Sequence, residues 1–285
     1  MKLYPINNGN FKLDGGAMFG VVPKSLWQRT NPADENNLCS WSMRSLLIED
    51  GDRLTLIDCG IGNKQSEKFY SFYYLHGDDT LDKGLAANGF HRDDITDVFL
   101  THLHFDHCGG AIEFNADKSG YRPAFKNARF WSNERHWQWA TTPNPREKAS
   151  FLTENIKPIQ ESGQLNFVDA PETEFIVPTD LGFDAVVVNG HTDAQMCPVL
   201  TYNGKKIVFM ADLLPSTGHI PLPYVMGYDT RPLLTMDEKA RFLNMAADEE
   251  LLLFLEHDPV NEVCTVQHTE KGVRLLNAGK LSDFV

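Results

Sequence analysis

Four apolar segments of this chain each lead into a histidine or an aspartate. The segment VFLT precedes His102, VVVNG precedes His191, IVFMA precedes Asp212, and LLLFLE precedes His257. Short apolar runs bounded by polar residues are typical of buried strands. The ends of such strands meet at one edge of a sheet, so that residues far apart in the sequence converge there. The pattern therefore predicts a sheet-based fold with a polar site at the strand ends.

Two segments have the pattern of a β-hairpin. The first, SMRSLLIEDGDRLTLIDCG, turns at an Asp-Gly pair and ends near Asp58, and the second, CPVLTYNGKKIVFMAD, turns at an Asn-Gly pair and ends at Asp212. These pairs are strong signals for a tight turn between antiparallel strands. The repetition indicates a fold with two similar halves.

Helical patterns lie between the predicted strands. The segment SNERHWQWA is predicted to begin with Ser132 as N-cap, and TMDEKARFLNMAADEE with a capping box of Thr235 and Glu238. Four ring-bearing residues in or directly before the first segment are predicted to lie on one helix and to pack in the interior, with a wall for an acyl chain or an oligomer contact as the alternative: Trp131, His136, Trp137 and Trp139. Strands and helices alternate without a linker, so we expect a single domain over residues 1–285, with helices covering sheet.

The segment HLHFDH gathers histidines that would repel one another when protonated. His102 and His104 are two positions apart in a predicted extended segment, so both rings point the same way and can share one metal ion. Asp106 and His107 follow after the chain turns and are expected to face a second metal ion. The two glycines that follow carry no side chain to obstruct a neighbouring backbone.

The strand-end residues complete a set of seven candidate ligands: His102, His104, Asp106, His107, His191, Asp212 and His257. Five imidazoles and two carboxylates suit two divalent cations of borderline softness. Zinc is the first choice, with manganese, iron and cobalt as alternatives.

Composition excludes several classes of function. A formal net charge of −13 over 285 residues argues against a nucleic-acid partner, since phosphate backbones are bound by basic surfaces. The five scattered cysteines indicate reduced thiols, and no apolar run is long enough to span a membrane. The N-terminus has no signal-peptide pattern, so we expect a cytoplasmic protein, with secretion as the alternative if a signal has been removed. The sequence is compatible with either a monomer or a homodimer.

The chain resembles the metallo-β-lactamase superfamily in the motifs LIDCG, HLHFDH, NGHTD, MADLLP and LEHD. The resemblance implies an α+β fold, an αβ/βα four-layer sandwich in which two mixed sheets are flanked by helices. It implies that His102, His104 and His191 bind one metal and Asp106, His107 and His257 the other, with Asp212 bridging both. It also implies that Asp58 orients a ligand imidazole, a strand-end turn being the alternative.

Two longer stretches, FGVVPKSLWQRTNPADENN and ADLLPSTGHIPLPYVMGYD, resemble the branch that contains methyl parathion hydrolase and a group of N-acyl-homoserine lactonases. In the better-known lactonases a tyrosine that contacts the substrate carbonyl stands three residues after the bridging aspartate, where this chain has Pro215. The residues that could take its place in the substrate pocket are His219, Tyr224 and Tyr228, and Phe19 and Trp27 could form a hydrophobic rim of that pocket; packing is the alternative for each.

These observations predict a dinuclear metal hydrolase. A hydroxide bridging the two metals is expected to attack a lactone or ester carbonyl, most simply in an N-acyl-homoserine lactone. Asp106 and Asp212 are the predicted catalytic carboxylates, with Asp106 relaying a proton to the leaving group. The first alternative is a phosphotriesterase, and an alternative of another class is a non-catalytic metal-binding protein. The partner is then a small lactone, ester or phosphotriester.

Overall fold

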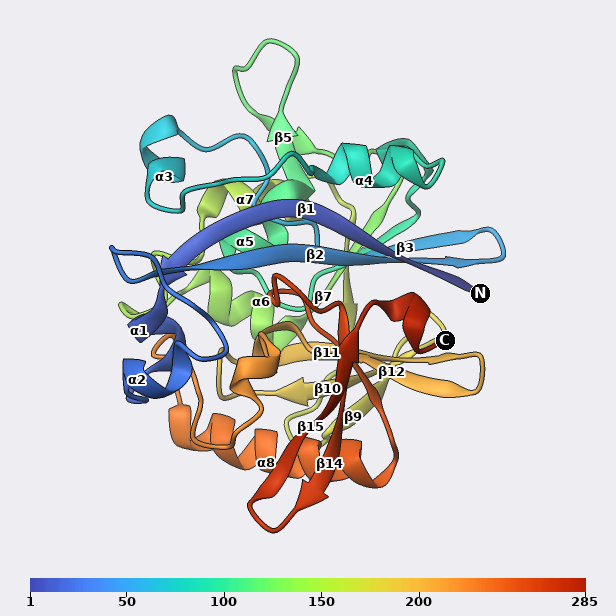
Figure 1. Ribbon diagram of the computed structural model, residues 1–285. Coiled ribbons are helices and arrows are strands. Elements are labelled where there is room, and N and C mark those ends of the chain that lie inside the picture. Colours follow the sequence, from blue (N-terminus) through green and yellow to red (C-terminus); the bar gives the residue numbers. More distant parts are fainter. The chain divides into compact units, whose positions relative to one another are not determined.

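The computed structural model describes residues 1–285, which divide into two compact units. The first unit comprises residues 1–9 and 43–182, and the second comprises residues 10–42 and 183–285. Each unit is discontinuous in sequence. Two long strands, β1 (Lys2–Asp14) and β2 (Leu38–Asp50), contribute residues to both (Figure 1).

The first sheet has six strands in the order β1-β2-β3-β4-β7-β8. Its remaining strands are β3 (Arg53–Ile57), β4 (Asp97–Phe99), β7 (Arg129–Asn133) and β8 (Leu165–Val168). β2 and β3 are antiparallel and form the predicted hairpin, whereas β3, β4, β7 and β8 are parallel neighbours. The sheet is therefore mixed. Its buried apolar face packs into a core that includes Leu47, Val98 and Phe130.

The second sheet has seven strands in the order β15-β14-β13-β12-β11-β10-β9. The strands are β9 (Ile176–Pro178), β10 (Asp184–Val188), β11 (Gln195–Tyr202), β12 (Lys205–Phe209), β13 (Leu252–Phe254), β14 (Val263–Thr269) and β15 (Gly272–Gly279). β11 and β12 form the second predicted hairpin, and β12 pairs in parallel with β13. This sheet is also mixed, as expected.

The strand ends show a regular spacing that positions the candidate ligands. His102, His191, Asp212 and His257 each lie three residues after the last residue of β4, β10, β12 and β13 respectively. The parallel register pairs Phe209 with Phe254, so Asp212 and His257 leave the sheet side by side. Strand pairing within each sheet thus brings distant polar residues to the same edge, as the sequence pattern predicts.

The helices of the first unit are short, and the second unit has one long helix. The first unit contains α3 (Glu67–Ser71), α4 (Leu81–Ala87), α5 (Phe105–Cys108), α6 (Glu134–Thr141) and α7 (Thr153–Glu161). The second contains α1 (Gly15–Phe19), α2 (Lys24–Trp27) and α8 (Pro232–Asp248), which packs on β14 (Figure 1). No helix has both the length and the apolar character needed to cross a bilayer.

Two predicted helix starts are wrong. Ser132 lies in β7, and the side chain of Asn133 caps α6 by accepting a hydrogen bond from the His136 N–H. The helix α8 begins at Pro232, three residues before the predicted capping box, because Pro favours the first helical position. Glu238 instead accepts hydrogen bonds from the N–H groups of Asn189 and Gly190, just before His191.

Trp131 also departs from the sequence prediction. It lies in β7 rather than in the helix that carries the other aromatic residues of its segment. Its indole Nε1–H donates a 2.8 Å hydrogen bond to Asp97 Oδ1. The ring is buried, in agreement with the expected packing role.

The two glycines after HLHFDH lie against the segment that follows β3. A Cβ atom on Gly110 would lie 2.1 Å from the carbonyl oxygen of Cys59, and one on Gly109 would lie 2.2 Å from that of Ile61. The Gly110 N–H donates to the Gly60 carbonyl at 2.8 Å. Close contact between these backbones is therefore possible only with glycine at both positions.

We expect Gly110→Ala to lower the free energy of unfolding by about 1–3 kcal/mol, because the added methyl group overpacks a backbone contact. The corresponding fall in Tm is several degrees. The matched control is Gly120→Ala, where the nearest atom to the new Cβ is 3.4 Å away. Thermal unfolding of the two variants gives the comparison, and equal Tm values would contradict it.

Candidate metal centre

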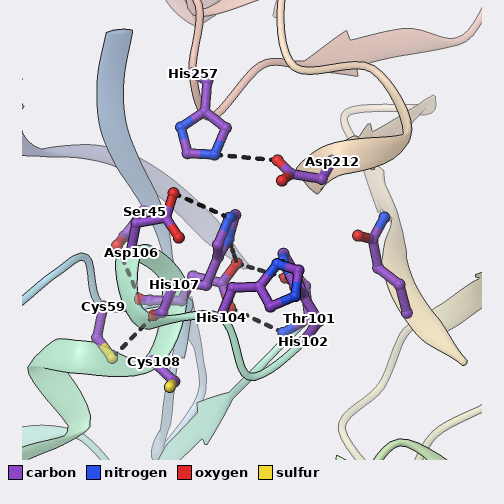
Figure 2. Close-up of polar contacts among 12 residues, drawn as sticks. Ser45, Cys59, Thr101, His102, His104, Asp106, His107, Cys108, Asp212 and His257 are labelled. Atoms are coloured by element: carbon purple, nitrogen blue, oxygen red, sulfur yellow. Dashed lines mark hydrogen bonds and ion pairs between the residues drawn. The ribbon is translucent and has the colours of Figure 1, made fainter. Parts of the chain in front are cut away.

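The first unit places four candidate ligands together after β4. His102 and His104 lie in an extended segment, and the short helix α5 then turns the chain and carries Asp106 and His107 (Figure 2). All four side chains are buried. The Nε2 atom of His102 lies 3.0 Å from the Nδ1 atom of His104, so the two rings face a common point, as the spacing predicts.

The partners of these rings determine which nitrogens are left as acceptors. Thr101 Oγ1 donates to Asp58 Oδ2 at 2.6 Å, so it can only accept from His102 Nδ1, which is 3.1 Å away. The Nε2 atom of His104 lies 3.4 Å from the carboxylate oxygen of Glu147, which assigns the ring proton to that side. Two lone pairs therefore face each other at 3.0 Å. A divalent cation between them fits this donor set.

Asp58 holds the third histidine of the segment. Its Oδ2 atom lies 3.0 Å from the Nδ1 atom of His107, and its Oδ1 atom accepts from the Thr101 N–H at 2.8 Å. The ring proton of His107 is thereby assigned to Nδ1, and Nε2 becomes the ligand nitrogen, 3.8 Å from Asp106 Oδ2. Asp58 has a φ of +54°, in the left-handed region that aspartate adopts more readily than most residues.

The second unit places the other three candidates around one carboxylate. The two oxygens of Asp212 lie 3.1 Å from the Nε2 atoms of His191 and His257. The Nδ1 atom of His191 is 2.9 Å from Asp229, and that of His257 is 2.8 Å from the carbonyl oxygen of Ser42. Both rings thus direct Nε2 toward Asp212, which is the geometry of ligands arranged for a cation. Figure 2 shows the pair formed by Asp212 and His257.

The charge around His191 also fits a cation. Burial alone would lower the pKa of His191, but the carboxylates of Asp212 and Asp229 on either side raise the pKa to about 10. Without a metal ion the ring therefore carries a proton at neutral pH. A metal ion must displace that proton, so metal binding at this site releases protons and weakens as the pH falls.

Three residues near the candidate ligands escaped the sequence analysis as parts of the site. Glu147 lies beside His104 and is held by Trp139 Nε1 at 2.7 Å and by Asn144 Nδ2 at 2.6 Å. Asp229 lies beside His191, and His136 Nε2 accepts from the N–H of Leu103 at 2.8 Å. Tertiary structure alone brings these residues to their partners. The only sequence signal is that each lies in a polar loop or helix start next to aromatic or apolar residues.

The cysteine beside the motif is a packing residue. The Sγ atom of Cys108 is buried and donates to the carbonyl oxygen of Leu103 at 3.3 Å. All five cysteines are buried and unbridged, in agreement with the expectation of reduced thiols.

Three of the five predicted pocket residues form a buried stack in the second unit. The ring of Phe19 lies between those of Trp27 and His219, at centroid distances of 5.3 and 4.4 Å and interplanar angles of 6°. The ring nitrogens of His219 contact Ser216 Oγ and the carbonyl oxygen of Met18, both at 2.9 Å. Burial lowers the pKa of His219 to about 3, so the ring is neutral. These rings are packed against one another rather than exposed as a rim, and a contact with substrate stays a prediction.

Tyr224 and Tyr228 lie on the loop that follows Asp212. Tyr224 is half-buried with its ring edge against Phe19, while Tyr228 is 41% exposed. Pro215 and Asp212 line one narrow space that has no room for a water molecule. Of the predicted pocket residues, Tyr228 is therefore the most accessible.

An aromatic group that the sequence analysis did not single out packs on the motif itself. The rings of Phe69 and Tyr73 lie 5.4 and 4.7 Å from the ring of Phe105, which separates His104 from Asp106. Burial, aided by the charge of Asp106, raises the pKa of Tyr73 to about 12. The first unit thus places an apolar surface next to four candidate ligands. Its sequence signal is the aromatic run KFYSFYYL.

Comparison with known proteins agrees with this architecture. The sequence model of the Metallo-beta-lactamase superfamily matches residues 44–257, a range that contains all seven candidate ligands. A probable metal-dependent hydrolase from Staphylococcus aureus is 28% identical, with a TM-score of 0.85 over 98% of this chain and 96% of that one. No curated protein sequence matches the chain significantly.

Two lactonase structures share the fold at lower identity. AidC, a dizinc quorum-quenching lactonase solved with an N-acyl-homoserine product, is 21% identical, with a TM-score of 0.76 over 96% of this chain and 93% of that one. A variant of AiiA from B. thuringiensis with N-decanoyl-L-homoserine at its active site is 17% identical, with a TM-score of 0.67 over 90% and 93%. The family match and the similarity to the probable metal-dependent hydrolase, together with the mixed sheets flanked by helices, show that the chain belongs to the metallo-beta-lactamase superfamily and is a metal-dependent hydrolase.

Proposed function

We propose that this protein is a dinuclear metal hydrolase that opens lactone or ester bonds, with N-acyl-homoserine lactones as its substrate class. The observation that carries the proposal is the position of Asp212. Its two oxygens face the Nε2 atoms of two different histidines at 3.1 Å each, one histidine from each predicted ligand set. A carboxylate placed in this way suits a bridge between two cations.

The donors of the two units are proposed to act together as one domain. His102, His104 and His191 would hold one cation, and Asp106, His107 and His257 the other, with Asp212 shared. The family match supports this assignment because it spans both units and includes all seven residues. Imidazole and carboxylate donors favour zinc, with manganese, iron and cobalt as alternatives.

Two bound cations would supply a water that ionises near neutral pH and a Lewis acid for the substrate oxygen. Other residues of the chain would orient the ligand side chains, hold their ring protons and transfer a proton to the leaving group. Asp58 and Asp229 would each hold the ring proton of one ligand histidine, which fixes the tautomer and the ring orientation, and the charge of Glu147, 3.4 Å from His104 Nε2, favours a proton on that nitrogen. Asp106 lies at the start of α5, where its carboxylate can pass a proton to the departing alkoxide.

The choice of an acylated lactone rests on two observations. Structures with the same fold hold N-acyl-homoserine products. In this chain Phe69, Tyr73 and Phe105 form an apolar surface beside His104 and Asp106, where an acyl chain can be buried. The hydroxyl of Tyr228, on the loop that follows Asp212, is the proposed polar contact to the substrate.

The presence of Pro215 favours a second candidate activity, the hydrolysis of phosphotriesters. This residue stands where the better-known lactonases of the resemblance have a tyrosine that contacts the substrate carbonyl. A phosphotriester does not need that contact if its phosphoryl oxygen is bound by a cation. Phosphotriester hydrolysis is therefore the alternative activity of the same site.

Elemental analysis of the purified protein is expected to give about two metal ions per chain, since both ligand sets are complete. Chelation should abolish hydrolysis, and added zinc should restore it. Initial rates on acyl-homoserine lactones, unsubstituted lactones, aryl esters and paraoxon-type triesters then rank the substrates. The highest kcat/KM should be for an acyl-homoserine lactone. A higher kcat/KM for the triester would favour the alternative, and about one metal ion per chain would contradict the dinuclear site.

Asp212→Asn is expected to reduce metal occupancy and turnover together. Loss of a residue that only orients a ligand weakens metal binding by about 10–100-fold, and loss of a shared ligand should exceed that. The control is Asp184→Asn, which removes an exposed carboxylate in the same unit. Unchanged turnover at full metal occupancy in Asp212→Asn would refute the bridging role.

A further inference from the structure

Lys239 is a buried cation with no carboxylate among its hydrogen-bond partners. Its side chain is 1% exposed and extends from α8. The Nζ atom donates to three backbone carbonyl oxygens: His219 at 3.0 Å, Pro221 at 3.3 Å and Tyr224 at 2.8 Å. All three N–H bonds of the ammonium group are thereby used, and all three acceptors lie within one loop.

That loop, residues 216–229, is tied at both ends to the candidate metal ligands. At its start, the N–H and hydroxyl of Thr217 donate to Asp258, the neighbour of His257, at 3.0 and 2.8 Å. At its end, Asp229 lies 2.9 Å from His191 Nδ1. Between the two ends, short turns are closed by backbone hydrogen bonds such as that from the Tyr224 N–H to Pro221, and the Gly227 N–H donates to the Ala17 carbonyl at 2.7 Å. Lys239 adds three side-chain hydrogen bonds to carbonyl groups between these points.

The free-energy cost of burying the charged group of Lys239 indicates that this side chain has a specific role. Burial lowers the pKa of Lys239 to about 7, and only Asp229 acts in the opposite direction. A methionine or leucine of similar volume would fill the space without that cost. Lys239 lines one narrow space, with no room for a water molecule, together with Asp212, Asp229 and Tyr224, so its side chain lies close to residues of the candidate site.

We propose that Lys239 is a positioning residue: by binding the carbonyl groups of His219, Pro221 and Tyr224, it holds the loop in the conformation that sets Asp229 against His191 and presents Tyr224 and Tyr228 to the substrate. The inference about substrate rests on the proposed function. The inference about the loop rests on the hydrogen bonds alone.

The test compares Lys239→Met with Ala246→Gly. Methionine keeps the apolar stem and removes all three donors. Ala246 is a buried residue on the same helix, and its replacement by glycine weakens α8 without removing a contact to the loop. Hydrogen exchange measured by mass spectrometry reports the opening of residues 216–230 in both variants.

Loss of hydrogen bonds from a charged donor should speed exchange in this segment about tenfold or more in Lys239→Met. The same segment in Ala246→Gly should exchange as in the unmodified protein once global stability is matched with denaturant. Exchange that is equal in the two variants would overturn the proposal. If Lys239→Met does not fold, Lys239→Gln, which keeps two donors on a shorter stem, is measured against the same control and should show the same local effect.

Two further readouts separate positioning from general stability. The imidazole N–H proton of His191, observed by NMR, should shift or broaden in Lys239→Met and stay unchanged in Ala246→Gly. In hydrolysis assays KM should rise more than kcat falls, because Tyr224 and Tyr228 are displaced. Altered exchange without turnover in the unmodified protein would leave the role of Lys239 in the loop intact and would refute the proposed function.

Discussion

Parallel strand pairing is the constraint on which the candidate site depends. β3 pairs in parallel with β4, and β12 with β13, so that each pair of strands ends at the same edge of its sheet. The Asp58 N–H donates to the Phe99 carbonyl, which carries the first pairing beyond the end of β3. In the second sheet the register alone brings Asp212 beside His257. A one-residue slip in either pairing would turn these side chains to the opposite face.

A further group lies beside each candidate ligand histidine. Asp58, Glu147 and Asp229 contribute carboxylates to three of them, Thr101 contributes a hydroxyl to His102, and Ser42 contributes a backbone carbonyl oxygen to His257. Each leaves one defined ring nitrogen for a metal ion, which lowers the cost of organising the site when the ion binds. This arrangement explains why many ionisable groups are buried in both units, since each must be held in a fixed position to orient a candidate ligand.

The strands, the two hairpins and the spacing of the candidate ligands could be predicted from local patterns, whereas the four-layer fold could be predicted from the family resemblance. Apolar runs, turn dipeptides and the HLHFDH spacing are readable within a few residues. Of the groups beside the candidate ligands, Asp58 could be predicted through the family resemblance. Glu147 and Asp229 could not be predicted, because Glu147 meets His104 and Asp229 meets His191 only through tertiary structure. The failure at Glu238 has the same origin: a residue suited to cap its own helix instead binds the backbone before His191.

Anomalous diffraction at the metal absorption edge, from crystals of the metal-loaded protein, tests the central claim most directly. The account predicts two peaks, one about 2.0–2.2 Å from nitrogens of His102, His104 and His191, and the other at the same distance from His107 and His257. An oxygen of Asp212 should lie within bonding distance of each peak. A single peak, or two peaks away from these side chains, would contradict the account.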